Sequence, residues 1–122
     1  MLRQLAETFL SERKNGNMRA LWKLKRVAAQ PNVDAETLVM LAETSDASVQ
    51  SIAASHRKTP VETLRKLSRE KNKKIDEELA FNENTPTDIL HELANSPDAR
   101  IRRGVARNPS TSGEKNDPHA NQ

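Results

Sequence analysis

The side chains of this 122-residue chain that could bind a ligand are mainly lysines and arginines, whose usual ligands are phosphates and carboxylates. The chain has 20 lysines and arginines against 17 acidic residues, so its net charge is +3. Four of the arginines lie close together, and such a cluster could neutralise nucleic-acid phosphates: Arg100, Arg102, Arg103 and Arg107. Aromatic side chains, on which unpaired bases stack, are only 2% of the residues. The stacking platform of a single-strand binder is therefore nearly missing.

The remaining polar residues indicate neither catalysis nor metal binding. The histidines, His56, His91 and His119, have no ligand spacing. The absence of cysteine excludes thiolate metal sites, iron–sulfur clusters and disulfides. No Ser/His/Asp constellation can be placed, and three glycines are too few for a phosphate-binding loop. We therefore expect a protein that is not an enzyme and that holds no metal and no cofactor.

A repeat of 26 residues determines where these side chains lie. Equivalent positions carry the same apolar residue types: Ala28, Ala54, Ala80 and Ala106; Leu38, Leu64 and Leu90; Leu41, Leu67 and Leu93. A fixed period of this size is typical of stacked units, each of which buries one apolar stripe against its neighbours. The repeat predicts an elongated stack rather than a closed core.

Each copy of the repeat predicts two short helices. The first begins at Thr59-Pro60 or Thr85-Pro86, where the threonine hydroxyl caps the helix and proline takes the first helical position. The second begins at a residue whose side-chain oxygen can cap a helix: Asp46, Asn72 and Asp98. His56 occupies the turn position of Asn82 and Asn108, so we expect it to make a turn hydrogen bond.

The segment from Thr85 to Pro109 contains one complete pattern, Thr-Pro-x-x-x-Leu-x-x-Leu-Ala-x-x-x-Asp-x-x-Ile-Arg-x-x-Val-Ala-x-Asn-Pro. This pattern resembles the leucine-rich repeat variant (LRV) family, and the resemblance covers roughly residues 27–112. The family implies pairs of helices, the second often 3₁₀, stacked in a right-handed superhelix loosely similar to HEAT repeats, and it implies a scaffold role. The Cys-rich iron–sulfur segment of its founding type has no counterpart here, because the chain has no cysteine.

With this resemblance, the repeats predict an all-α fold: a right-handed α-solenoid of about three helical pairs behind an N-terminal helical cap. We expect one repeat domain over 1–110, with cap helices in 1–30 and repeats in 31–56, 57–82 and 83–109. Residues 111–122 are expected to be a disordered tail, because Pro118 interrupts the next copy. No apolar run approaches the roughly 18 residues of a membrane span, so we expect no membrane association and a cytoplasmic location.

Several residues carry a charge opposite to that of the residue 26 positions later, at the equivalent place in the next repeat. This predicts ion pairs between neighbouring helices: Asp76 with Arg102, Glu77 with Arg103, Glu43 with Arg69, and Lys66 with Glu92. Seven cations are left without an acidic partner: Lys23, Lys25, Arg26, Lys73, Lys74, Arg100 and Arg107. A basic row on the second helices could bind phosphates, so these seven are the candidate nucleic-acid site.

Four apolar residues fall at or near repeat positions that are otherwise polar: Trp22, Val39, Met40 and Phe81. Aromatic residues and methionine are enriched at protein interfaces, although local packing would explain the same residues. The sequence favours a non-catalytic protein–protein interaction module, a small scaffold or adaptor with an unidentified protein partner. The alternative is a nucleic-acid-binding helical-repeat protein that uses the basic row.

The last repeat has no obvious polar cap. We therefore expect an exposed apolar edge that includes Ile89, Leu93 and Val105. Two such edges can bury each other about a two-fold axis, which allows a homodimer through the C-terminal repeat. Gly104 stands where the other copies have Ile52 and Glu78, so we expect the backbone to be closely approached there.

Overall fold

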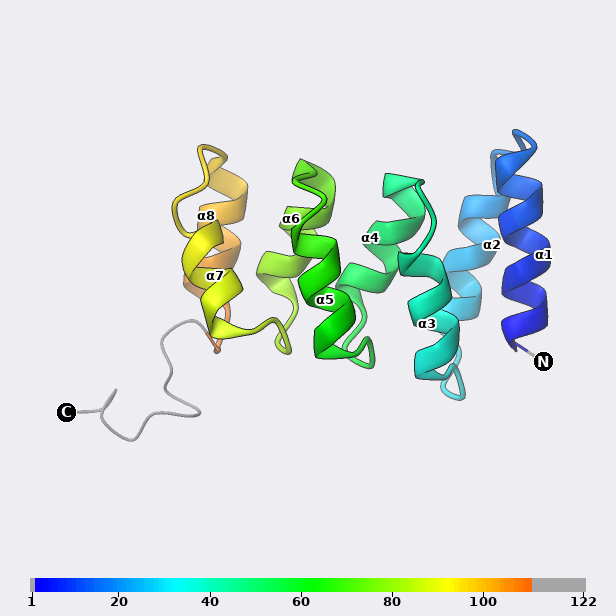
Figure 1. Ribbon diagram of the computed structural model, residues 1–122, viewed down its shortest axis with the longest axis horizontal. Coiled ribbons are helices and arrows are strands. Elements are labelled where there is room, and N and C mark those ends of the chain that lie inside the picture. The colour runs from blue at the N-terminus through cyan, green and yellow to red at the C-terminus, as the bar shows by residue number, and fades with distance from the viewer. Residues whose placement is uncertain (1, 111–122) are drawn as a thin grey trace.

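The computed structural model describes residues 2–110, and every regular element in that range is an α-helix (Figure 1). The helices are α1 (Leu2–Lys14), α2 (Arg19–Ala28), α3 (Ala35–Ala42), α4 (Ala47–Ser55), α5 (Val61–Ser68), α6 (Lys73–Phe81), α7 (Thr87–Leu93) and α8 (Ala99–Arg107). The all-α prediction is confirmed for this part of the chain. None of these helices is both long enough and apolar enough to cross a bilayer. The expected tail and His119 lie outside the described residues.

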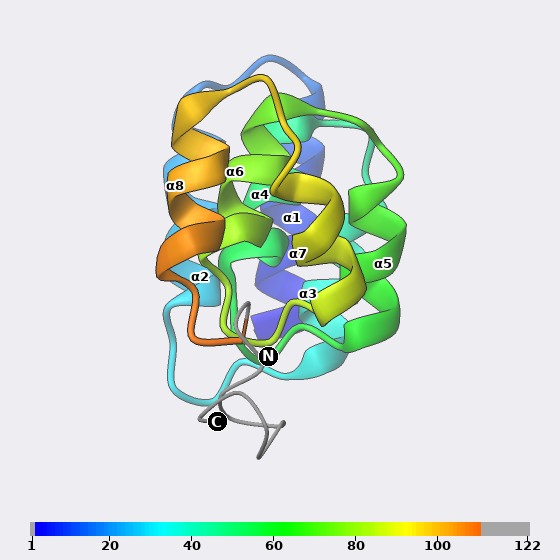
Figure 2. The same ribbon diagram turned by 90° about the vertical axis from the view of Figure 1, so that its left-hand side faces the viewer.

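The helices lie in two rows that run the length of the molecule (Figure 1). Helices α2, α4, α6 and α8 form one row and pack side by side in that order, and α1, α3, α5 and α7 form the other. Figure 2 looks along both rows from the α7–α8 end. Each of the stretches 31–56, 57–82 and 83–109 thus contributes one helix to each row.

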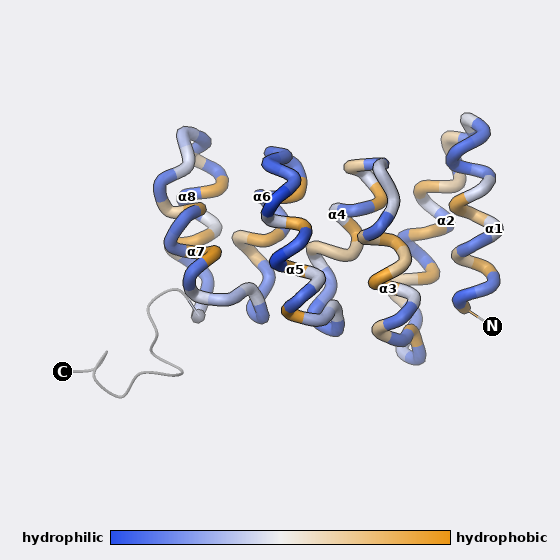
Figure 3. The backbone as a smooth tube through the Cα atoms, viewed as in Figure 1, coloured by the Kyte–Doolittle hydropathy of each residue, from blue (hydrophilic) through white to orange (hydrophobic). Residues whose placement is uncertain are grey.

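The core lies between the rows and is built from the repeated leucines. Apolar and polar residues alternate along each helix (Figure 3), since a helix returns to the same face every three or four residues. The leucines at the two repeated positions are all buried: Leu38, Leu41, Leu64, Leu67, Leu90 and Leu93. At Gly104 an added Cβ would lie 3.0 Å from the Cβ of Ala80. The expected close approach is therefore present, between α6 and α8.

The second helix of each pair begins where the sequence predicts. Asp46 accepts a hydrogen bond from the Ser48 N–H at 3.0 Å. In the following pairs Asn72 accepts from Lys74 N at 2.9 Å and Asp98 accepts from Arg100 N at 2.8 Å. These contacts satisfy N–H groups that have no partner inside the helix.

The capping role predicted for Thr59 and Thr85 is wrong. Helix α5 begins after Pro60, with no side-chain cap, and the Thr59 hydroxyl instead donates to Ala53 O at 2.6 Å. Thr85 likewise donates to Leu79 O at 2.7 Å. Both hydroxyls are buried and need an acceptor, and the carbonyls of Ala53 and Leu79, which each accept one backbone N–H, have a second lone pair for it. Each threonine therefore fixes the turn onto the end of the preceding helix.

Hydrogen bonds between equivalent turns connect successive helical pairs. Asn82 Nδ2 donates to Ala54 O at 2.8 Å and to His56 O at 3.1 Å. Asn108 makes the same two contacts 26 residues later. His56 occupies this position in the first pair, and its Nε2 lies 2.9 Å from Ala28 O. The turn hydrogen bond expected for His56 is confirmed, and it reaches back to α2.

The apolar edge predicted at the C-terminal repeat is wrong. Ile89, Leu93 and Val105 are only 3%, 7% and 2% exposed. Each pair buries its stripe within itself and against the pair before it. Ala106 on α8 is exposed, whereas its equivalent Ala80 is buried. The homodimer was predicted to form through this edge, and the three side chains that it would use are buried within the chain.

Candidate functional site

The structure separates the four apolar residues predicted to contact a partner. Trp22 on α2 is 61% exposed and Phe81 at the end of α6 is 56% exposed, whereas Val39 and Met40 on α3 are half-buried. Met40 packs against the core. The Phe81 ring covers Gly104, where an added Cβ would meet it at 3.0 Å. Contacts within the fold thus cover part of the apolar surface of Met40 and Phe81, whereas Trp22 lines a surface groove.

This groove, the cap groove, lies between α1 and α2 and has a volume of about 480 Å³. Its lining residues are Leu2, Leu5, Phe9, Trp22, Lys23, Arg26, Val27 and Gln30. The spacing of Leu2, Leu5 and Phe9 places all three on one face of α1. Helix α1 is the end of its row, so neighbouring helices cover only part of this face and Leu5 stays 46% exposed.

Two cations border the aromatic rings of the cap groove. The Arg26 guanidinium carbon lies 5.0 Å from the centroid of the Trp22 ring, and Lys23 Nζ lies 5.3 Å from that of Phe9. Both distances suit a cation–π interaction. Lys23 also pairs with Glu12 at 3.1 Å, but Arg26 forms no ion pair within residues 2–110. The guanidinium N–H groups of Arg26 are therefore available to a ligand.

The prediction that seven cations lack acidic partners is wrong for Lys23, Lys73 and Arg100. Lys73 Nζ lies 2.9 Å from Asp98 Oδ2, and Arg100 Nη1 lies 4.0 Å from Glu77 Oε1. The Lys73 ammonium also lowers the pKa of Asp98. These pairs neutralise part of the proposed basic row, which leaves fewer charges for phosphate contacts.

The ion pairs expected for Asp76 and Glu77 do not form within residues 2–110. Glu77 pairs with Arg100 instead, and Arg102 Nη1 donates to Ser96 O at 2.7 Å. Helical side chains lean toward the N-terminus of their helix, so Arg102 folds back onto its own turn. Asp76 Oδ1 is buried without a hydrogen-bond partner in the described residues, and burial raises the pKa of this carboxyl.

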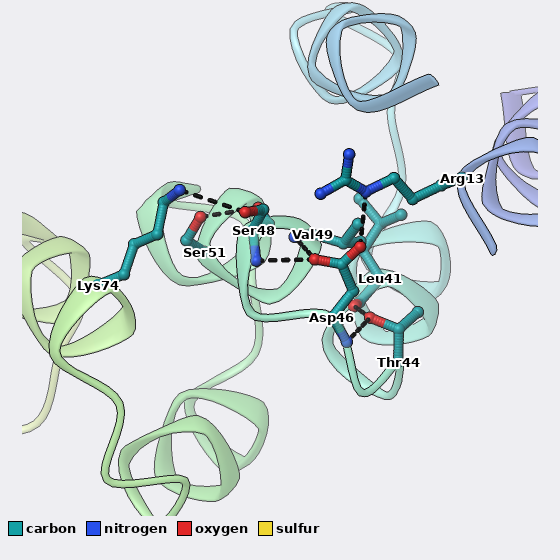
Figure 4. Close-up of polar contacts among 8 residues, drawn as sticks. All are labelled: Arg13, Leu41, Thr44, Asp46, Ser48, Val49, Ser51 and Lys74. Atoms are coloured by element: carbon teal, nitrogen blue, oxygen red, sulfur yellow. Dashed lines mark hydrogen bonds and ion pairs between the residues drawn. The ribbon is translucent and has the colours of Figure 1, made fainter. Parts of the chain in front are cut away.

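A second groove, which we call the serine groove because Ser51 and Ser55 of α4 line it, has a volume of about 350 Å³. Lys25 on α2 and Lys74 on α6 line it, together with Glu78. Lys74 Nζ donates to Ser48 Oγ at 3.2 Å (Figure 4). Burial raises the pKa of Glu78, while the two lysines act in the opposite direction. A carboxyl group beside both lysines disfavours phosphate, so the serine groove is poorly arranged for nucleic acid.

A contact at the start of α4 was not anticipated from the sequence (Figure 4). Asp46 caps α4 through Oδ1, and its Oδ2 accepts from Arg13 Nε of α1 at 2.7 Å. Partial burial raises the pKa of Asp46, but the Arg13 guanidinium and the backbone N–H groups outweigh it and hold the pKa below its ordinary value. This contact fixes α1, one wall of the cap groove, against α4. A separation of 33 residues gives no sequence signal for such a pair.

The histidines do not assemble a metal site in the described part of the chain. His56 is engaged in its turn and His91 is exposed on α7. Residues 2–110 contain no group of three or more histidine or acidic side chains that could hold a metal ion.

Comparisons with known proteins do not assign a function to these grooves. Comparisons of the chain with protein-family models, with curated proteins and with solved structures gave no match. The resemblance to LRV repeats therefore stays a prediction, and the cap groove and its charges are the features from which a function can be inferred.

Proposed function

We propose that this chain is a non-catalytic protein–protein interaction module. Its fold in this proposal is a right-handed α-solenoid of three LRV-like helical pairs behind an N-terminal cap, acting as a small scaffold or adaptor in the cytoplasm. The side-by-side row of α2, α4, α6 and α8 supports stacked repeats, as do the equivalent hydrogen bonds of Asn82 and Asn108. Stacked repeats commonly serve as extended binding surfaces.

The observation that carries the proposal is the exposed apolar surface of the cap. Large apolar side chains are exposed at five positions of the described residues, and Leu5, Met18 and Trp22 are three of them. Two of these, Leu5 and Trp22, line one groove with Arg26. Tryptophan and arginine in a partly enclosed apolar site are typical of the residues that dominate protein interfaces.

Nucleic-acid binding through the second helices is the competing proposal. Lys25 and Arg107 support it, since both are exposed and neither forms an ion pair within residues 2–110. Affinity that depends on phosphate contacts falls steeply with salt concentration, because each contact releases a condensed counterion. Salt dependence therefore separates the two proposals.

Affinity capture from an extract of the native host tests the function, with nuclease added in one arm. The bait proteins are wild type, Trp22→Ala and the matched control Phe81→Ala, which removes another exposed aromatic ring outside the cap groove. We expect one discrete protein to be retained by wild type and Phe81→Ala, lost with Trp22→Ala, and unaffected by nuclease. Retention that nuclease abolishes, or that is identical for all three baits, contradicts the proposal.

A further inference from the structure

We propose that the segment bound in the cap groove is an acidic amphipathic helix of the partner protein; this inference rests on the proposed function. Three features restrict the class of ligand that can bind: the apolar floor of the groove, the charges at its edge, and the amino acids absent from its lining.

The apolar floor of the cap groove has the length of a short helix contact. Leu2 and Phe9 are seven residues apart on α1, which at 1.5 Å per residue is about 10 Å, or two helical turns. Trp22 and Val27 line the opposite wall from α2. A helix that presents apolar residues at i, i+3 or i+4, and i+7 places its anchors over the same length.

The charges at the edge of the groove select acidic flanking residues. Lys23 and Arg26 line the groove, and no carboxylate does so among the described residues. Lys23 is partly neutralised by Glu12, whereas Arg26 keeps its N–H groups free of ion pairs in residues 2–110. A guanidinium binds a carboxylate through two parallel hydrogen bonds, so a glutamate beside the apolar anchors is the complementary group.

The shape of the site favours a helix over other anionic ligands. An anionic membrane presents a broad surface, whereas this apolar surface is a groove between two helices that is bordered by polar residues. A single-stranded nucleic acid would stack a base on Trp22, but Phe9, the other ring of the described lining, already has Lys23 Nζ 5.3 Å from its centroid, and the rest of the α1 wall, Leu2 and Leu5, is aliphatic.

Trp22 is the chain's single tryptophan, so its fluorescence reports occupation of the groove directly. The probe is a synthetic helix of about 18 residues with leucine at i, i+3, i+4 and i+7 and glutamate at most other positions. A second peptide has lysine in place of glutamate. Vesicles of anionic phospholipid and oligouridylate form two further arms. We expect the acidic peptide to shift the Trp22 emission saturably and the lysine peptide to bind at least about 10-fold more weakly.

Variants of the full chain test the role of the charge. Arg26→Glu should weaken the acidic peptide about 10-fold and improve binding of the lysine peptide. Val61→Ala, which removes part of an exposed apolar side chain on α5, outside the cap, should leave both affinities unchanged. Leu5→Ala should weaken both peptides, and it keeps the test decisive if Arg26→Glu does not fold, as judged by circular dichroism.

Equal binding of the two peptides, no binding of the acidic peptide, or no effect of Arg26→Glu in a folded protein overturns the inference. An emission shift with vesicles or oligouridylate, but not with the acidic peptide, also overturns the inference and identifies a membrane or a nucleic acid as the ligand of the groove. If the peptides fail while Trp22→Ala still loses a captured protein, the proposed function stands and only the chemistry of the occupant is wrong. If capture also fails to depend on Trp22, both proposals fall.

Discussion

Replacing Asn82 by alanine tests whether the turns between helical pairs hold the stack together. Asn82 is 4% exposed, and its Nδ2 group donates to Ala54 O at 2.8 Å and His56 O at 3.1 Å. Its Oδ1 accepts from Asn84 N at 2.9 Å. Asn82→Ala removes all three hydrogen bonds and leaves two carbonyls and one N–H group without this partner.

A hydrogen bond contributes about 1 kcal/mol net, and a polar group left buried without a partner costs more. We therefore expect Asn82→Ala to lower the free energy of unfolding by about 3 kcal/mol. Small domains have a total stability of about 5–15 kcal/mol, so a loss of this size is a large fraction of the whole. Urea unfolding followed by far-ultraviolet circular dichroism measures it as a fall in the midpoint concentration.

His56→Asn is the matched control for this experiment. His56 already fills the equivalent position and reaches Ala28 O through Nε2. Asparagine there can adopt the geometry of Asn82, so the free energy of unfolding should change by less than about 1 kcal/mol. A loss below about 1 kcal/mol for Asn82→Ala, or equal losses for the two variants, would refute the reasoning.

Three further predictions concern charge and packing. Gln50, the equivalent of Asp76, donates from Nε2 to Ala42 O at 3.3 Å, so Asp76→Gln should gain the matching bond and stabilise the fold by about 1 kcal/mol in urea unfolding at pH 7. That gain should shrink in acid, because the raised pKa of Asp76 favours its protonated form; a gain that grows in acid contradicts this. Asp46 has a lowered pKa, so its contribution to the free energy of unfolding is present above about pH 4 and is lost as the pH falls. Asp46→Asn should therefore cost about 1 kcal/mol at pH 7 and much less at about pH 3, and an equal cost at both would count against the Arg13 contact. Leu93→Ala should cost about 3 kcal/mol as a buried truncation, and a loss below about 1 kcal/mol in chemical denaturation would mean that the repeat phase is wrong.

The sequence by itself determined the features that depend on neighbouring residues. Asp46, Asn72 and Asp98 begin helices in the structure because a side-chain oxygen caps an N–H group two or three residues away. The buried leucines follow from helical periodicity in the same way. His56 was assigned to a turn because it replaces the asparagine of the later copies.

The tertiary structure alone decided which partners meet across the stack. Thr59 has a carbonyl of the preceding helix within reach, so its hydroxyl is used there rather than as a cap. Glu92 pairs with Lys71 at 3.9 Å rather than with the expected Lys66. A residue number gives the level of a side chain along the stack, but the direction in which the side chain leans and the offset between helices select its partner.

The cap groove is the clearest case in which the fold, and not the sequence, made the decision. The spacing of Leu2, Leu5 and Phe9 indicates one apolar helical face. Helix α1 is the last in its row, so Leu5 and Trp22 remain exposed side by side with Arg26. Periodicity shows that a helix has an apolar face, but the packing of neighbouring helices decides how much of that face is left uncovered.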